Sequence, residues 1–290
     1  MFGYLFAIIA LFIWGLIVIP IRKTKTSGLY GIGISMLVAF AALLIPAIII
    51  FMQKGLVFSS GRVLMAALVG VFQFSIGTAF YYEGIRLAGA SVGAPLSRLK
   101  PIIVGFIALV FGIELLSFNQ ILAGVIVSIG AGMLIYAPGR NVISRDGMKK
   151  GIVFALATPF FWAIGDILVK QLQTGAGAMH PLLLTEMALL SGLIVYYSVI
   201  FLEKKQDMIF KMPRDDKKKY AMHGLLSLSI AYLAFFASIG IIGLMKAVII
   251  TTAWPLISMI VGVAFLKEGL NKIKLFGGIL IVVSVYLTLS

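Results

Sequence analysis

The sequence has no cysteine among its 290 residues, which excludes disulfide bonds, thiolate nucleophiles and thiolate metal sites. Its two histidines do not have the spacing of metal ligands, and we find no zinc motif or catalytic triad. The glycine-rich phosphate loop that ends in Lys-Ser/Thr is also missing, so ATP is not the evident energy source. We therefore expect a protein that is not an enzyme and that needs no cofactor or metal.

Charge is scarce as well. Only 12% of the residues are charged, whereas a soluble domain has about a quarter. Hydrophobic residues make up 61% of the chain, and the mean hydropathy is +1.12. The charges gather in short segments between apolar runs that are long enough to cross about 30 Å of hydrocarbon. The first run has no preceding basic region or cleavage site, so we expect a permanent helix there.

Ten such runs are present, and helices are expected because backbone groups cannot stay unpaired in lipid. The 31 glycines suit close packing of such helices. The sequence thus predicts an all-α integral membrane protein with ten transmembrane helices. The predicted spans are 3–21, 28–51, 62–84, 89–112, 117–137, 150–173, 181–202, 219–239, 243–266 and 273–289.

The chain carries the same pattern in both halves, with a Pro, a Glu and a Gly at spacings of 13 and 10 residues. The two copies are Pro101, Glu114, Gly124 and Pro255, Glu268, Gly278. Five spans per half is an odd number, so the second half enters the membrane from the opposite side. We therefore expect two inverted five-helix repeats, at 1–142 and 149–290.

The basic residues are distributed unevenly between the two sides of the predicted bundle. The odd-numbered loops, counted with the adjoining span ends, hold 18 Lys and Arg, and the even-numbered loops, counted in the same way, hold 4. The positive-inside rule then places the odd-numbered loops in the cytoplasm, in a multi-pass protein of the plasma membrane. The net charge of +14 does not indicate nucleic acid, because the basic residues flank hydrophobic spans and have no base-stacking surface among them. We expect Lys217–Lys219 to contact anionic lipid.

Several short motifs resemble those of the drug/metabolite transporter superfamily, EamA type. They are Phe12–Gly15 at a helix start, Ala90–Pro95 leading to Pro101, and Gly112–Leu115 and Lys267–Leu270 after the fourth and ninth spans. The resemblance covers both halves. It implies a ten-helix fold with a central cavity and alternating access for a small metabolite, often an amino acid, a sugar or a related compound. It does not specify the substrate.

Two cations lie inside the fourth span, where an ionisable residue costs about 2.5–3.5 kcal/mol on insertion scales. These are Arg98 and Lys100, and about 200° of helix rotation separates them, so they cannot both point at one ligand atom. We expect at least one to bind an anionic group of the substrate, and Arg98 suits this best because its planar fork makes bidentate contacts. The alternative is an interhelical ion pair or snorkelling to an interface. The equivalent positions in the second half are Thr252 and Trp254, which suggests a cavity for an amphipathic, acid-bearing substrate.

Polar residues on the third and eighth spans are further substrate-binding candidates. Gln73, Thr78, Tyr82 and Tyr232 could line a wet cavity, or they could pack at tight helix crossings. Trp14 could lie in the cavity or at the membrane interface.

Prolines recur at matching positions of the two halves. Because Pro101 and Pro255 each remove a backbone hydrogen bond within a span, we expect hinges there, the alternative being helix curvature alone.

The acidic residues within the spans have competing interpretations. Asp166 could pair with Lys170 four residues on, serve as a proton or cation site, or pair with Arg98. Glu186 could be a protonatable coupling group or an interfacial residue near His180.

Three other acidic residues have simpler expected roles. Glu83 should pair locally with Arg86, and Glu114 and Glu268 should cap or pair with neighbouring loops.

The first hypothesis is a secondary active transporter, an exporter or exchanger, of a small polar metabolite such as an amino acid or related organic acid. A multidrug exporter of cations is the main alternative, and it needs Asp166 or Glu186 to dominate over Arg98 and Lys100 in the cavity. A non-transporting intramembrane binding protein is the other. The expected partners are a small-molecule substrate and the lipid bilayer, with the chain a monomer or homodimer.

Overall fold

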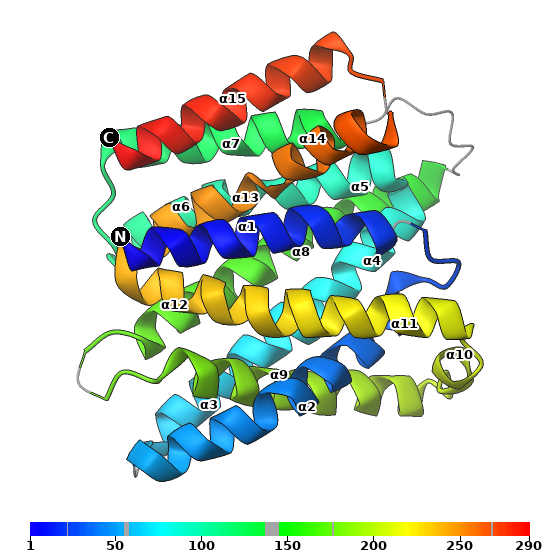
Figure 1. The fold of residues 1–290 in the computed structure, drawn as a ribbon, viewed down its shortest axis with the longest axis vertical. Helices are drawn as coiled ribbons and strands as arrows, with labels where there is room; N and C mark the ends of the chain where they lie inside the picture. Colours follow the sequence, from blue (N-terminus) through cyan, green and yellow to red (C-terminus); the bar gives the residue numbers. More distant parts are fainter. Residues whose placement is uncertain (22, 55–57, 137–144, 176, 268) are drawn as a thin grey trace.

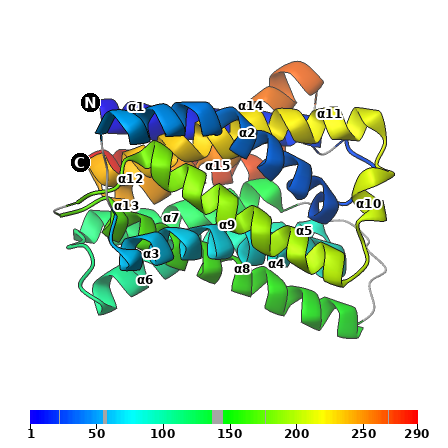
Figure 2. The same cartoon turned by 90° about the horizontal axis from the view of Figure 1, so that it is seen from below.

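The computed structural model describes residues 1–21, 23–54, 58–136, 145–175, 177–267 and 269–290, and over these ranges the chain is helical without strands. Ten helical segments in the described residues are long and apolar enough to cross a membrane, which confirms the ten predicted spans. Figures 1 and 2 show them as one bundle. The segments are Phe2–Ile21, Gly28–Gln53, Ser60–Ala88, Val92–Val110, Phe118–Ile135, Asp146–Leu172, Pro181–Leu202, Arg214–Ile242, Leu244–Phe265 and Lys272–Leu289.

Six spans are single helices, and four are assembled from shorter pieces. The single helices are α1 (Phe2–Ile21), α2 (Gly28–Lys54), α7 (Phe118–Ile135), α8 (Arg145–Leu172), α9 (Pro181–Leu202) and α15 (Lys272–Leu289). The composite spans are α3 (Ser60–Gly70), η1 (Val71–Ile76) and α4 (Gly77–Ala88); α5 (Ala90–Leu96), η2 (Ser97–Leu99) and α6 (Lys100–Val110); α11 (Arg214–His223), η3 (Gly224–Ala231) and α12 (Tyr232–Ile242); α13 (Leu244–Thr252) and α14 (Trp254–Leu266). A short helix, α10 (Asp207–Phe210), lies between the seventh and eighth spans.

The composite spans are interrupted at matching positions of the two halves. The π-helical segments η1 and η3 occupy equivalent places in the third and eighth spans. Gly89 (φ 80°) precedes the fourth span, and Gly243 (φ 92°), 154 residues later, precedes the ninth. Since only glycine adopts this backbone region readily, the duplication extends from the sequence pattern to local conformation.

The two prolines of the repeated pattern lie at the starts of helices. Each sits in the first turn of its helix, Pro101 in α6 and Pro255 in α14, directly after a break. Proline is tolerated there because the first turn has no intrahelical partner for its missing N–H. The predicted loss of regular helix is therefore present, but it lies just before each proline.

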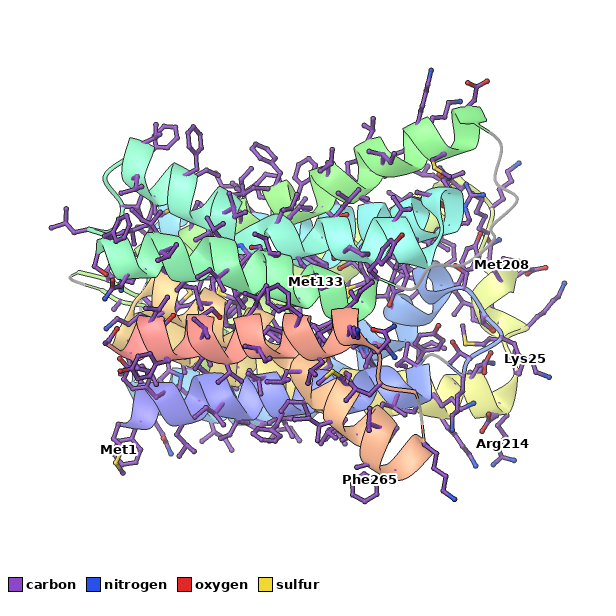
Figure 3. All side chains as sticks on the ribbon, turned by 90° about the horizontal axis from the view of Figure 1, so that it is seen from above. Met1, Lys25, Met133, Met208, Arg214 and Phe265 are labelled. Atoms are coloured by element: carbon purple, nitrogen blue, oxygen red, sulfur yellow. The ribbon has the colours of Figure 1, made fainter. Side chains whose placement is uncertain are left out.

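The bundle has two chemically different ends. Both termini lie at one end, and α10 lies at the other (Figure 1). Figure 3 shows Lys25 and Arg214 at the end opposite Met1, with apolar side chains covering the flanks. Exposed aromatic residues of the spans include Phe106, Phe118 and Tyr286, as expected of helices that face lipid.

Candidate functional site

A cavity of about 780 Å³ lies between the two halves and is lined by residues from both. Nine residues predicted from the sequence as substrate-binding or hinge residues line it. They are Trp14, Thr78, Tyr82, Arg98, Lys100, Tyr232, Thr252, Trp254 and Pro255. The residues proposed for the site thus come together at one place, although they lie on five of the ten spans.

Tryptophan and tyrosine dominate the aromatic part of the wall. All three tryptophans of the chain line the cavity, at positions 14, 162 and 254. Five tyrosines join them, at positions 81, 82, 136, 220 and 232. These side chains combine an apolar ring with a polar group, so the wall suits a substrate that has both characters. Trp14 was expected either in the cavity or at the membrane interface, and in the structure it lines the cavity.

Arg98 lies in the break η2 and is buried, with 7% of its surface exposed. Its Nε and Nη2 donate to the Ser97 hydroxyl at 3.1 and 2.7 Å, and this hydroxyl in turn donates to the Ala94 carbonyl at 2.7 Å. The guanidinium carbon is 5.0 Å from the centroid of the Trp254 ring, a cation–π distance. Among the described residues no carboxylate pairs with Arg98. The cavity therefore contains a buried guanidinium that has no counter-ion within the described part of the chain.

Lys100 has such a counter-ion. Its Nζ lies 2.9 Å from Oδ2 of Asp166, whose side chain is fully buried in α8. The second carboxylate oxygen, Oδ1, accepts a hydrogen bond from Nε2 of Gln73. The same amide also donates to the Trp162 carbonyl at 3.3 Å, and the Trp162 indole donates to the Gln73 carbonyl at 3.2 Å. Gln73 therefore supports the ion pair from behind and does not line the cavity.

These contacts correct two expectations. Asp166 pairs with neither Lys170 nor Arg98, since its carboxylate meets Lys100 of the fourth span. In the described residues Lys170 belongs to no ion pair. Interhelical packing decided the partner, because a fully buried carboxylate needs a counter-ion that is buried with it.

Glu186 does not belong to the cavity wall. It is buried in α9 with 7% exposure, and within the described chain neither carboxylate oxygen has a hydrogen-bond partner. His180 precedes α9 and caps its start, where its Nδ1 accepts from the Leu182 N–H at 3.2 Å. Pro101 is likewise outside the lining residues, unlike Pro255.

Two acidic residues have the structural roles predicted for them. Glu83 pairs with Arg86 at 2.7 Å. Glu114 Oε2 accepts from the Leu244 N–H at 2.6 Å and so caps the start of the ninth span. Glu268 lies outside the described residues.

His223 is a lining residue that the sequence reasoning did not select. Its Nδ1 lies 3.1 Å from the hydroxyl of Ser35, and this hydroxyl donates its single hydrogen to the Tyr220 carbonyl at 2.7 Å. Nδ1 is then the donor to Ser35, so a neutral His223 keeps a free acceptor on Nε2. His223 and the lining residue Ser227 lie one helical turn apart and share a face of the eighth span.

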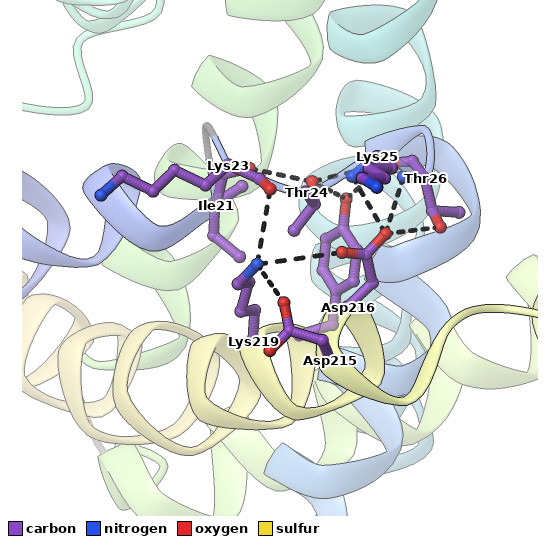
Figure 4. A network of polar contacts seen from close by, with 9 residues as sticks. Ile21, Lys23, Thr24, Lys25, Thr26, Asp215, Asp216 and Lys219 are labelled. Atoms are coloured by element: carbon purple, nitrogen blue, oxygen red, sulfur yellow. Dashed lines mark hydrogen bonds and ion pairs between the residues drawn. The ribbon is translucent and has the colours of Figure 1, made fainter.

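At the mouth of the cavity, α11 holds the loop that follows α1 (Figure 4). Asp216 Oδ2 accepts from the Lys25 N–H at 3.0 Å and from the N–H and hydroxyl of Thr26, each at 2.8 Å. The Tyr220 hydroxyl donates to the Thr26 carbonyl at 3.0 Å and lies 3.1 Å from the Thr24 hydroxyl. We call these five residues the mouth clamp. Because Thr24 and Tyr220 also line the cavity, the clamp fixes part of its rim.

The deep end of the cavity is closed by an aromatic cluster. Tyr232 contacts Phe74 and Trp14 at ring-centroid distances of 4.8 and 5.1 Å, and Trp14 contacts Phe235 at 5.4 Å. Phe235 is fully buried, and the Lys100 Nζ lies 4.8 Å from its ring centroid. The cavity therefore reaches from the charged pair toward the mouth clamp, with packed rings behind it.

Comparison with known proteins gives three findings. The profile of the EamA-like transporter family matches residues 1–136 and 149–290. A protein of Archaeoglobus fulgidus described as an uncharacterized transporter is 25% identical over 240 residues, which cover 81% of this chain and 78% of the relative. A solved crystal structure of a protein has the same fold, with a TM-score of 0.77, 15% identity, and coverage of 99% of this chain and 98% of that one.

Proposed function

We propose, on the premise that the chain belongs to the EamA-like transporter family and is a multi-pass membrane transporter, that it carries a small polar metabolite with an anionic group. Transport would be secondary active and would proceed by alternating access, as export or exchange. An amino acid or a related organic acid is the substrate class that fits best. The single observation that carries this proposal is the buried Arg98 guanidinium, which faces the cavity and has no carboxylate partner among the residues that the structure describes.

The physical argument rests on the cost of a buried charge. An unpaired cation in a low-dielectric site is stabilised strongly by an anion that enters with matching geometry. The substrate would supply this anion, its carboxylate bridging the guanidinium and its body resting against Trp254 and Tyr232. Matched breaks in the fourth and ninth spans, on either side of this site, support a gating role for the segments before Pro101 and Pro255.

The proposed orientation follows from the basic loops. The mouth clamp lies at the end where Lys25 and Arg214 are exposed (Figure 3), and the positive-inside rule assigns this end to the cytoplasm of a plasma-membrane protein. The cavity would then be open toward the cytoplasm, and the aromatic cluster would be the closed gate. Inversion of the two repeats, 1–142 and 149–290, is supported by five spans in each half.

A cation exporter is the weaker candidate. It would need a carboxylate in the wall, and no Asp or Glu of the described residues lines the cavity. Asp166 is neutralised by Lys100, and Glu186 lies elsewhere in α9.

The test is thermal stabilisation of the purified protein by a panel of amino acids, organic acids, sugar phosphates, nucleosides and lipophilic cations. The wild type is compared with Arg98→Gln, which keeps a polar side chain without the charge, and with Lys246→Gln as a control on the ninth span outside the lining residues. Stabilisation by an anionic or zwitterionic compound, lost in Arg98→Gln and kept in Lys246→Gln, supports the proposal. Stabilisation by cations alone, unchanged in Arg98→Gln, contradicts it.

A further inference from the structure

Two cations line the inner cavity, and within the described residues Asp166 behind its wall is the one carboxylate that pairs with either of them. It pairs with Lys100, whereas no described carboxylate pairs with Arg98. The only other charged residue of the described lining is Lys274 on α15, which begins on the basic side of the bundle. The net charge of Arg98, Lys100 and Asp166 together is therefore one positive unit.

Contacts with Gln73 fix the position of the Asp166 carboxylate. Gln73 donates to Oδ1, and the Gln73 side chain is itself packed against α8. A Cβ on Gly165 would come within 2.5 Å of the Gln73 Cγ, so a side chain larger than that of glycine at 165 would displace it. Asp166 has no exposed surface, whereas the Lys100 side chain is 14% exposed and reaches the cavity. The carboxylate thus acts from behind the wall, and the lysine is the group that a substrate meets.

From this arrangement we infer that Asp166 sets the charge of the substrate: by neutralising Lys100 it leaves one cation for the ligand, so the site accepts one anionic charge and rejects a second. The inference rests on the proposed function, because it assumes that an anion binds at Arg98. A substrate with one carboxylate completes the charge balance of the cavity. A dianion adds a charge that meets an occupied lysine and the negative Asp166 behind it, in a setting with little screening.

Asp166 is accordingly a specificity-determining residue that acts through Lys100. The isosteric variant Asp166→Asn removes the internal charge and keeps an oxygen that can accept from Gln73. Lys100 then becomes a second free cation, and dianions should gain affinity relative to monoanions. The double variant Lys100→Met/Asp166→Asn removes both charges and returns the net charge to one positive unit.

The experiment measures dissociation constants with matched probes that differ by one charge: succinate and its monomethyl ester, and glutarate and its monomethyl ester, at constant ionic strength. Intrinsic fluorescence is a suitable signal, because all three tryptophans line the cavity. We expect the wild type to prefer the monoester in each pair and Asp166→Asn to shift the ratio toward the dianion by roughly tenfold or more. The double variant should return the ratio to that of the wild type.

The outcomes separate the two proposals. If Asp166→Asn binds the probes with an unchanged ratio, or if the double variant keeps the ratio of Asp166→Asn, the inference is overturned while anion binding stands. If Arg98→Gln binds the monoesters as well as the wild type does, the proposed function fails with it. If no probe binds either the wild type or Asp166→Asn, the site takes neither these dicarboxylates nor their monoesters and the inference is overturned, while the thermal panel still decides the proposed function.

Discussion

The breaks in the fourth and ninth spans have similar backbones and different chemistry. In the first half the break η2 contains Arg98 and is followed by Lys100; in the second half Thr252 and Trp254 occupy the equivalent positions. All four line one cavity, and Arg98 lies over the Trp254 ring. The comparison shows that the duplicated backbone supplies the interruptions, whereas divergence of side chains makes one wall cationic and the other aromatic.

A second comparison concerns the contacts between the first span of one half and the third span of the other. Asp216 accepts backbone N–H groups of the loop after α1. Its equivalent 154 residues earlier, Arg62, donates to the Leu172 carbonyl at the end of α8, at 3.1 Å. One duplicated position thus joins the halves through an acceptor in one case and a donor in the other.

The largest effect is expected from exchanging the two breaks. Arg98→Thr should weaken binding of an anionic ligand by roughly 10- to 100-fold, since a hydrogen bond to a charged group contributes about 1.5–3 kcal/mol. Thr252→Arg in the same chain should restore part of this affinity, because both positions line the cavity. Titration of tryptophan fluorescence checks both variants. Equal binding by wild type and Arg98→Thr would show that the asymmetry of the breaks has no role in recognition.

The mouth clamp should give the next largest effect, this time on stability. Asp216→Ala leaves two backbone N–H groups and one hydroxyl without their acceptor, and we expect a loss of about 1.5–3 kcal/mol. Asp215→Ala is the matched control: this side chain is 76% exposed and pairs with Lys219, so its loss should cost at most about 1 kcal/mol. Thermal unfolding in detergent measures the difference, and similar melting temperatures for the two variants would refute a structural role for the clamp.

Alanine substitution of the two glycines that precede the fourth and ninth spans should lower stability at both positions, but to different extents. Alanine at either position meets a backbone region that costs about 1–3 kcal/mol for residues with a side chain. Gly243→Ala should be the more destabilising variant, because its Cβ would lie 2.5 Å from Glu114 Oε1 and would disturb the cap on Leu244. Gly89→Ala provides the comparison in the same thermal assay, and a larger loss at 89 would contradict this account of the cap.

The smallest effect is expected for the binding of anionic lipid to Lys217–Lys219, at the basic end of the bundle. Lys217 donates to the Phe210 carbonyl at 2.8 Å and Lys219 pairs with Asp215 at 2.5 Å, so the exposed Lys218 is the best placed for headgroups. Lys218→Gln should weaken binding of anionic lipid by about 1 kcal/mol, whereas Lys218→Arg should not. Native mass spectrometry with phosphatidylglycerol measures this, and equal lipid binding by both variants would exclude the contact.

The sequence was sufficient for the fold because lipid permits few alternatives. Ten apolar runs in a chain that must satisfy its own backbone can only become helices, and the structure differs mainly at their ends. The eighth span begins at Arg214 and not near 219. A charged first turn, which contains the clamp residue Asp216, precedes the apolar residues within the same helical segment.

The site was predictable where intramembrane charge marked it and not where packing decided. Arg98 and Lys100 stood out because charges within spans are costly, and both line the cavity. The partner of Asp166 could not be found from helical spacing, because it depends on how the fourth and sixth spans face each other. Whether His223 lines the cavity depends in the same way on the rotation of the eighth span about its axis.

The central claim, an anion carrier that works through Arg98, is tested most directly by counterflow in sealed proteoliposomes. The vesicles are preloaded with the compound that best stabilises the wild type, and uptake of its labelled form is followed for wild type and Arg98→Gln. Our account predicts transient accumulation by the wild type and none by Arg98→Gln, with both proteins inserted equally. Binding without accumulation in the wild type, or equal accumulation by both proteins, would contradict it.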